Sequence, residues 1–203
     1  GKVFDASEAG NDGRLIGDAK ILNSGETSQI SDDSRGHYLV VDGDGDYVEI
    51  PNHDSLQLDS QATVSAWVRP EEFISLSGIV SKWALNNPSW NLRLWSGSSK
   101  KLVRFGDRSH DAVSKNELRE KRWTHVVATF DKEERMVRIY VNGRLDAEHE
   151  RLSGSLQVNS APVQIGNDFD KRFFDGAIDD VRIYRRALSR KEVADLYSLE
   201  SGN

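Results

Sequence analysis

Apolar and polar residues alternate with a period of two over much of the chain, which is the pattern of strands with one buried face. The clearest example is the stretch 126–130, and a charged connection joins it to a second alternating stretch, 137–141. The second stretch runs into Asn142 and Gly143, a dipeptide that tolerates positive φ at both positions and favours a tight turn. Together these features predict an antiparallel meander inside a larger sheet.

Two opposing signals bear on the register of this hairpin. A two-residue turn places Ile139 opposite Asp146, whereas a three-residue loop places Ile139 opposite Ala147 and keeps apolar residues on one face. Turn chemistry favours the first register and burial favours the second. We expect the second, and the cross-strand partner of Ile139 decides between them.

Further apolar stretches bounded by turn residues recur along the chain. They predict strands at 38–41, 47–50, 63–70, 79–83, 90–95, 102–105, 162–166 and 177–184. Residues 1–36 are polar with short apolar islands, so we expect loops and one or two edge strands there. About ten short strands separated by turns are typical of an all-β, two-sheet antiparallel sandwich or jelly roll. No long linker interrupts the pattern, so we expect a single domain over residues 1–203.

One short C-terminal helix is predicted. Ser189 and Glu192 have the spacing of a capping box, in which each side chain bonds the other residue's backbone N–H. Leu188 and Val193 occupy the positions of a hydrophobic staple around that cap. An apolar stripe begins at Val193, so we expect a helix over roughly 190–198.

Composition narrows the class of protein. The chain has 203 residues, no cysteine and a net charge of −6. A core of this size needs no disulfide, and the lack of cysteine excludes thiolate metal sites. The acidic balance argues against a nucleic-acid partner, which would require a basic surface. We expect no membrane insertion, because no apolar run of about 18 residues is present, and the first residues lack the apolar stretch of a signal peptide.

Several ordered segments resemble a known family. These are LVVDGDGDYVEIP, ATVSAWVRP, RWTHVVATFD, VRIYVNG and FDGAIDDVRIYRRALSRKEV. They are similar to laminin G-like, concanavalin A-like lectin/glucanase domains of bacterial surface and secreted proteins. The resemblance covers nearly the whole chain and implies two antiparallel sheets, one of them concave, often with a bound calcium ion. It also implies an extracellular or cell-surface location, but this fold hosts lectins, adhesion modules and glycanases, so it leaves the function open.

A calcium site is the first candidate for chemistry, because Ca²⁺ prefers six to eight oxygen ligands. The candidate ligands are Asp5, Ser7, Asn11, Gly13 and Asp179. Related families hold a structural ion with an N-terminal loop and this kind of C-terminal Asp, and the two ends of a sandwich often lie side by side. The simpler interpretation is that these residues are turn formers and solvated acids. The DGDGD segment at 42–46 is expected to be a turn, because an EF-hand needs Gly and Glu where Tyr47 and His53 stand.

A glycan-binding surface is the second candidate. Sugars stack on aromatic faces, and planar polar groups bind their hydroxyls. The candidate residues are Trp83, Asn91, Arg93, Trp95, Arg104, Phe169 and Phe173. Asn91, Arg93 and Trp95 share one face of their predicted strand, and Arg104 has a matching phase on the next. The alternative is that the Trp side chains pack in the core and the Arg side chains are solvated; we expect a core position for Trp67 and Trp123.

Catalytic patterns are absent from the sequence. The paired carboxylates of family glucanases do not occur, and the five His residues lack any metalloprotease or triad spacing. His125 is expected to be a packed strand residue. We therefore expect a non-catalytic, lectin-like module of a larger secreted or surface protein, with a glycan as partner. Two alternatives remain: a protein-interaction or adhesion module, and a glycanase or polysaccharide lyase with an unfamiliar site.

Overall fold

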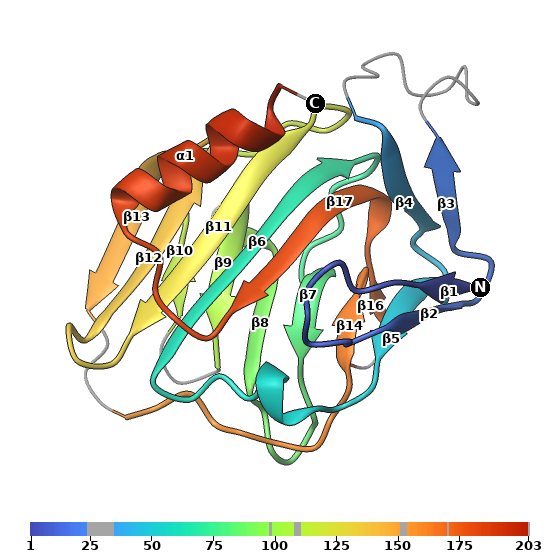
Figure 1. Cartoon of the computed structure of the whole chain (residues 1–203). Helices are drawn as coiled ribbons and strands as arrows, with labels where there is room; N and C mark the ends of the chain where they lie inside the picture. Colours follow the sequence, from blue (N-terminus) through green and yellow to red (C-terminus); the bar gives the residue numbers. More distant parts are fainter. Residues whose placement is uncertain (24–34, 98, 108–110, 151–153, 170, 203) are drawn as a thin grey trace.

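The computed structural model describes residues 1–23, 35–97, 99–107, 111–150, 154–169 and 171–202. These residues form two large antiparallel sheets packed face to face, with a short helix on the outside of one of them (Figure 1). The predicted all-β sandwich with a C-terminal helix is confirmed.

The first sheet has eight strands within the described residues. In spatial order they are β1 (Lys2–Val3), β2 (Gly13–Ile16), β5 (Tyr47–Ile50), β14 (Val163–Ile165), β7 (Gly78–Lys82), β8 (Trp90–Gly97), β9 (Lys100–Gly106) and β10 (Ala112–Val113). The N-terminal segment thus supplies short strands at one edge of this sheet, as its apolar islands predict.

The second sheet has seven strands in the same part of the chain. In spatial order they are β13 (Arg144–Glu150), β12 (Met136–Val141), β11 (Thr124–Asp131), β6 (Gln61–Pro70), β17 (Asp175–Tyr184), β4 (His37–Asp42) and β3 (Lys20–Asn23). A short 3₁₀ helix, Asp54–Leu56, precedes β6. The last strand, β17, lies between β6 and β4, which places the C-terminal end of the chain beside its N-terminal part.

The core fills the space between the two sheets. Trp90, Leu92 and Leu94 of β8 face it, and each is fully buried. Every second residue of β6 from Ala62 to Val68 meets them from the opposite sheet. Burying one large apolar side chain stabilises the fold by about 1.5–3 kcal/mol, so this alternating pattern fixes which face of each strand points inward.

The β12–β13 hairpin contains features of both registers considered above. Asn142 and Gly143 have φ values of 49° and 72°, so the turn has two residues and the expected three-residue loop is wrong. The register then shifts between Ile139 and Tyr140, and Ile139 pairs with Ala147 as expected. A β-bulge absorbs the extra residue, so turn chemistry and burial are both satisfied.

Helix α1 (Arg190–Glu200) covers the outer face of β11, β12 and β13 (Figure 1). Its predicted capping box is formed, with Ser189 and Glu192 each bonding the other's backbone N–H. Leu188 and Val193 pack against Val127 of β11 in a small cluster outside the main core. None of the described helices has the length and apolarity needed to cross a bilayer.

Candidate functional site

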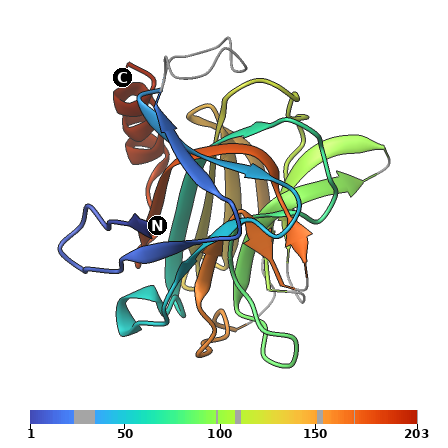
Figure 2. The same ribbon diagram turned by 90° about the vertical axis from the view of Figure 1, so that its right-hand side faces the viewer.

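The outer face of β8 and β9 gathers polar side chains around one tryptophan. Asn91, Arg93 and Trp95 alternate with core residues along β8, so they point away from the core, as their strand phase predicts. Arg104 of β9 is the cross-strand partner of Arg93. Figure 2 shows that the β8–β9 hairpin extends beyond the body of the sandwich. Four of the seven predicted glycan-binding residues therefore share the outer face of the sheet, where Asn91 and Arg93 are buried and Trp95 and Arg104 are half-buried.

A second, small hairpin covers part of this face. It consists of β15 (Asn167–Asp168) and β16 (Arg172–Phe173), and the Asn167 carbonyl accepts a 2.9 Å hydrogen bond from the Ser81 hydroxyl of β7. Gly78 allows the close approach, because a Cβ there would overlap the backbone of Asn167 and Asp168. The hairpin thereby places Asp168 over the outer face of the sheet.

Asp168 is a fully buried carboxylate held by planar donors. Its Oδ2 accepts hydrogen bonds from Asn91 Nδ2 at 3.0 Å and from an Arg93 guanidinium nitrogen at 3.2 Å. Arg172 approaches the same oxygen to 3.9 Å. Burial raises the pKa of Asp168, and the charge of Arg93 opposes that rise. The pair fixes the Arg93 side chain in one orientation.

Trp95 lies among cations. The Arg104 guanidinium carbon is 4.4 Å from the centre of the Trp95 ring, and that of Arg93 is 5.9 Å from it. Arg93 is also 6.0 Å from the Trp83 ring, and Arg104 forms an ion pair with Asp111. Burial, together with the neighbouring Arg93, lowers the pKa of Arg104 to about 10, so Arg104 remains charged at neutral pH. Trp95 itself is half-buried.

Several buried polar atoms in this region have unused hydrogen-bonding capacity. They are Asn91 Oδ1, Arg104 Nε, Asp111 Oδ1 and Asn167 Oδ1, and none has a hydrogen-bond partner among the described residues. Native proteins pair nearly all such atoms with protein, water or ligand. We define the Trp95 cluster as the side chains that come together around Trp95: Asn91, Arg93, Trp95, Arg104, Asp111 and Asp168. It combines a partly open aromatic ring with planar polar groups, which is the chemistry that the sequence predicts.

The other three predicted residues have different positions. Trp83 is only 9% exposed, so it packs beneath Arg93 and offers little surface to a ligand. Phe169 is half-buried next to Asp168. Phe173 stacks on Tyr47 of β5 with ring centres 6.3 Å apart, and β5 is three strands from β8, about 14 Å at the usual strand spacing. Phe173 therefore does not join the Trp95 cluster.

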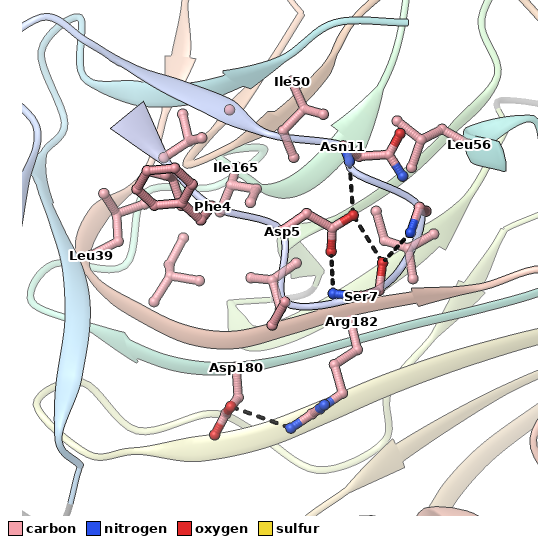
Figure 3. A pocket seen from close by; sticks show the side chains of 18 of the residues that line it. Phe4, Asp5, Ser7, Asn11, Leu39, Ile50, Leu56, Ile165, Asp180 and Arg182 are labelled. Atoms are coloured by element: carbon pink, nitrogen blue, oxygen red, sulfur yellow. Dashed lines mark hydrogen bonds and ion pairs between the residues drawn. The ribbon is translucent and has the colours of Figure 1, made fainter. Parts of the chain in front are cut away.

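A pocket of about 930 Å³ lies between the N-terminal loop and β17 (Figure 3). All five predicted calcium ligands line it: Asp5, Ser7, Asn11, Gly13 and Asp179. The N-terminal loop and the last strand thus border the same pocket.

Within the N-terminal loop, Asp5 organises the backbone. Its carboxylate accepts hydrogen bonds from the Ser7 N–H at 2.9 Å, the Ser7 hydroxyl at 2.9 Å and the Asn11 N–H at 2.8 Å. Burial raises the pKa of Asp5, but these hydrogen bonds outweigh burial and hold the pKa below its ordinary value. The Asn11 side chain bonds to the Ser55 hydroxyl. The Asp5 carboxylate thus ties Ser7 and Asn11 together and closes the loop.

On the opposite wall, Asp179 has a cationic partner within the chain. Arg35 Nε donates a 2.5 Å hydrogen bond to Asp179, and the same guanidinium pairs with Asp180. Arg35 is itself 4% exposed and stacks 4.4 Å from the Trp67 ring. Burial raises the pKa of Asp179, and the hydrogen bond from Arg35 opposes this. Arg35 thus supplies the positive charge that a metal ion would otherwise bring to Asp179. Trp67 is buried, as expected, with Arg35 over its ring, whereas Trp123 is half-buried near the same guanidinium, which differs from its expected core position.

A separate acidic group lies at the start of β5. Carboxylate oxygens of Asp18, Asp42 and Asp46 come within 4.8 Å of one another, the one such group of three among the described residues. Burial and a hydrogen bond with Asp18 raise the pKa of Asp46 to about 6. The DGDGD segment forms a turn between β4 and β5, as predicted.

His125 is fully buried beneath α1. Ser65 Oγ lies 2.9 Å from its Nε2, and Glu200 Oε2 lies 3.4 Å from the same nitrogen. A Ser–His–acid relay needs its two partners on opposite ring nitrogens. The group therefore lacks both the geometry and the exposure of a catalytic triad, and His125 is a packed strand residue, as predicted.

Comparison with known proteins agrees with this fold. Pentraxin-related protein PTX3 of Homo sapiens is 24% identical over 146 residues, which cover 66% of this chain and 38% of that protein. The chain thus spans well under half the length of this curated relative.

Two solved structures carry sugars. Domain 4 of AbnA, an extracellular arabinanase of Geobacillus stearothermophilus solved with arabinotriose, superposes with a TM-score of 0.68 and 20% identity, covering 91% of this chain and 87% of that one. The botulinum neurotoxin serotype D ligand binding domain, solved with N-acetylneuraminic acid, gives a TM-score of 0.67 and 15% identity, covering 98% of this chain and 50% of that one. At these identities the likeness establishes the fold.

The sequence itself matches a family directly. Residues 42–194, three quarters of the chain, match the family described as the concanavalin A-like lectin/glucanases superfamily. This match, the sandwich topology and the ordered motifs agree, and the chain belongs to the concanavalin A-like lectin/glucanases superfamily.

Proposed function

We propose that this chain is a non-catalytic, lectin-like module that binds a glycan at the Trp95 cluster. One observation carries the proposal: a half-exposed tryptophan lies beside buried planar polar groups that have unused hydrogen-bonding capacity. Aromatic rings bind the C–H faces of sugars, and amide, guanidinium and carboxylate groups bind sugar hydroxyls. The cluster brings all four kinds of group together at the outer face of β8 and β9.

Preorganisation favours binding at this surface. Asp168 fixes Arg93 and Asp111 fixes Arg104, so few side-chain rotamers are lost when a ligand arrives. Arg104 packs on Trp95 and holds the ring in place, and the part of the indole that stays exposed is available to a sugar. Hydrogen bonds to charged groups contribute about 1.5–3 kcal/mol each, so a few of them together with one stacked ring suffice for lectin-like affinity.

The comparisons support the class of ligand. An arabinanase domain and a neurotoxin binding domain of the same fold were solved with arabinotriose and N-acetylneuraminic acid. The arabinanase is an extracellular enzyme, which supports an extracellular or cell-surface location for this chain within a larger protein.

Substitution of Trp95 tests the site. After a panel of oligosaccharides has identified a ligand, Trp95→Ala should weaken its binding about tenfold or more, since one stacked ring is typical of a binding hot spot and 1.4 kcal/mol is a factor of ten. Phe4→Ala is the matched control, because Phe4 is 74% exposed and lies at the other pocket. Equal affinity of wild type and Trp95→Ala would refute the assignment. Release of sugar products during incubation would instead indicate a glycanase or lyase.

We also propose a structural calcium ion in the N-terminal loop. Asp5, Ser7, Asn11 and Gly13 provide carboxylate, hydroxyl, amide and carbonyl oxygens, the donor types that Ca²⁺ prefers. Asp179 fits the group less well, because Arg35 already neutralises it. The ion would fix the loop that closes the pocket.

Thermal melting with and without EDTA tests the ion. Ligand at a hundred times its dissociation constant stabilises the folded state by about 2.7 kcal/mol, so EDTA should lower the melting temperature of a calcium-loaded sample. Asp5→Asn should abolish this response, and Asp46→Asn should leave it unchanged. An unchanged melting temperature in wild type would count against a tight ion, and a response lost only in Asp46→Asn would place the ion at the other acidic group.

A further inference from the structure

The pocket between the two sheets has an apolar interior. Its walls include core side chains contributed by both sheets and by the 3₁₀ helix: Leu39, Val48, Ile50, Leu56, Ile165 and Ile178. Figure 3 shows the N-terminal loop with Phe4 and Asp5 over this space. A volume of about 930 Å³ lies in the range of small-molecule sites, which are mostly apolar with a few charged groups.

The acidic side chains at the rim already have partners. The loop's own N–H groups bind Asp5, and Arg35 binds both Asp179 and Asp180. Arg182 also lies 3.5 Å from Asp180, so cations oppose the charges of Asp179 and Asp180, whereas Asp5 keeps its negative charge. An anionic head group is therefore best placed at a cation on the β17 side of the pocket.

The arginines at the end of β17 differ in whether a carboxylate pairs with them. Arg182 is held by Glu200, and Arg186 pairs with Glu192. Arg185 is exposed and forms no ion pair with any other described residue; its weak electrostatic influence on Asp59 acts through space. Arg185 is thus an available cation on the rim of an apolar space.

We propose that this pocket binds a single-chain amphipathic carboxylate, with the hydrocarbon chain between the sheets and the carboxylate at Arg185. The apolar walls match the chain, and the uncompensated guanidinium matches the head group. This site is separate from the Trp95 cluster and from any glycan bound there.

Chain length gives the first test. Each buried CH₂ group contributes about 0.8 kcal/mol, a factor of about four in affinity. Calorimetric titration with octanoate, decanoate and dodecanoate below their micellar concentrations should therefore show one site whose affinity rises about fifteenfold for each pair of added carbons. Absence of saturable binding, or affinity independent of chain length, would overturn the proposal.

Head-group charge gives the second test. Decanoate should bind at least tenfold more tightly than decyltrimethylammonium or a decyl glucoside, and Arg185→Glu should remove that preference. Arg144→Glu makes the same charge change at an exposed position of β13 and should leave binding unchanged. Ala6→Trp, at an exposed position of the pocket mouth, should block all three probes. Tighter binding of the cation, or equal binding to wild type and Arg185→Glu, would contradict the assignment. Far-UV circular dichroism of each variant confirms folding.

Discussion

His125 shows how one buried residue links the fold to pH. It lies on β11 beneath α1, and its neighbours include Ser65, Glu200 and Tyr197. Burial, with the nearby cations Arg35 and Arg182, lowers its pKa from 6.5 to about 4. The Glu200 carboxylate does not offset this, because Trp67 and Arg182 already bind it.

The lowered pKa of His125 predicts a pH dependence of stability. Between about pH 4 and 6.5 the unfolded state binds a proton that the folded state does not, so the free energy of unfolding falls as pH drops through this window. One proton corresponds to about 1.4 kcal/mol per pH unit. Burial raises the pKa values of Glu200 and Asp179, and these two groups change the free energy of unfolding with pH in the opposite direction. Wild type and a His125→Gln variant share this contribution. Urea unfolding of wild type and His125→Gln should therefore show a shallower pH slope in the variant; identical slopes would contradict the account.

Gly78 is a second residue whose identity the structure requires. A Cβ at this position would overlap the backbone of Asn167 and Asp168. Gly78→Ala should push the β15–β16 hairpin away from β7 and break the contact between Asp168 and Arg93. We expect a loss of about 2–4 kcal/mol in the free energy of unfolding, as is usual for overpacking that also exposes a buried ion pair. The effect is measured by urea denaturation, with Gly36→Ala as the control, because a Cβ at Gly36 would meet no atom within 4 Å. A neutral effect of Gly78→Ala would argue against this packing.

At the scale of elements, α1 depends on its cap. The Ser189 hydroxyl accepts a hydrogen bond from the Glu192 N–H, which otherwise lacks an intrahelical partner. Ser189→Ala should therefore destabilise the protein by about 1 kcal/mol. Ser198→Ala, in the last turn of the same helix, should be neutral or slightly stabilising, because Ala has the higher helix propensity. Equal effects of the two substitutions in thermal melting would show that the cap contributes nothing.

Local sequence signals predicted these elements well. The capping box formed as predicted, because its hydrogen bonds lie within a few residues of one another. The two-residue Asn142-Gly143 turn that local chemistry favours also formed, although we expected the three-residue loop. The bulge that reconciles the turn with the burial of Ile139 was not predicted, since neither signal alone calls for an extra residue. Local chemistry thus fixes the ends of elements, and tertiary packing adjusts their register.

At the scale of the whole molecule, strand alternation predicted the sandwich and the outer position of Trp95, Arg93 and Arg104. It did not predict that Asp168 completes the Trp95 cluster, because 75 residues separate Asp168 from Arg93. The β15–β16 hairpin that joins them has only two residues in each strand, too few to show alternation. The pairing of Asp179 with Arg35 was not predicted either, because 144 residues separate the two.

Glycan binding at the Trp95 cluster can be followed through the indole N–H signals of the five tryptophans. In a titration of ¹⁵N-labelled protein with a glycan that binds, the Trp95 signal should shift progressively and saturate at one ligand per chain. Trp90, buried in the core, and Trp67, beneath α1, should remain unchanged. Saturable binding that leaves the Trp95 signal in place and shifts residues elsewhere would contradict the account.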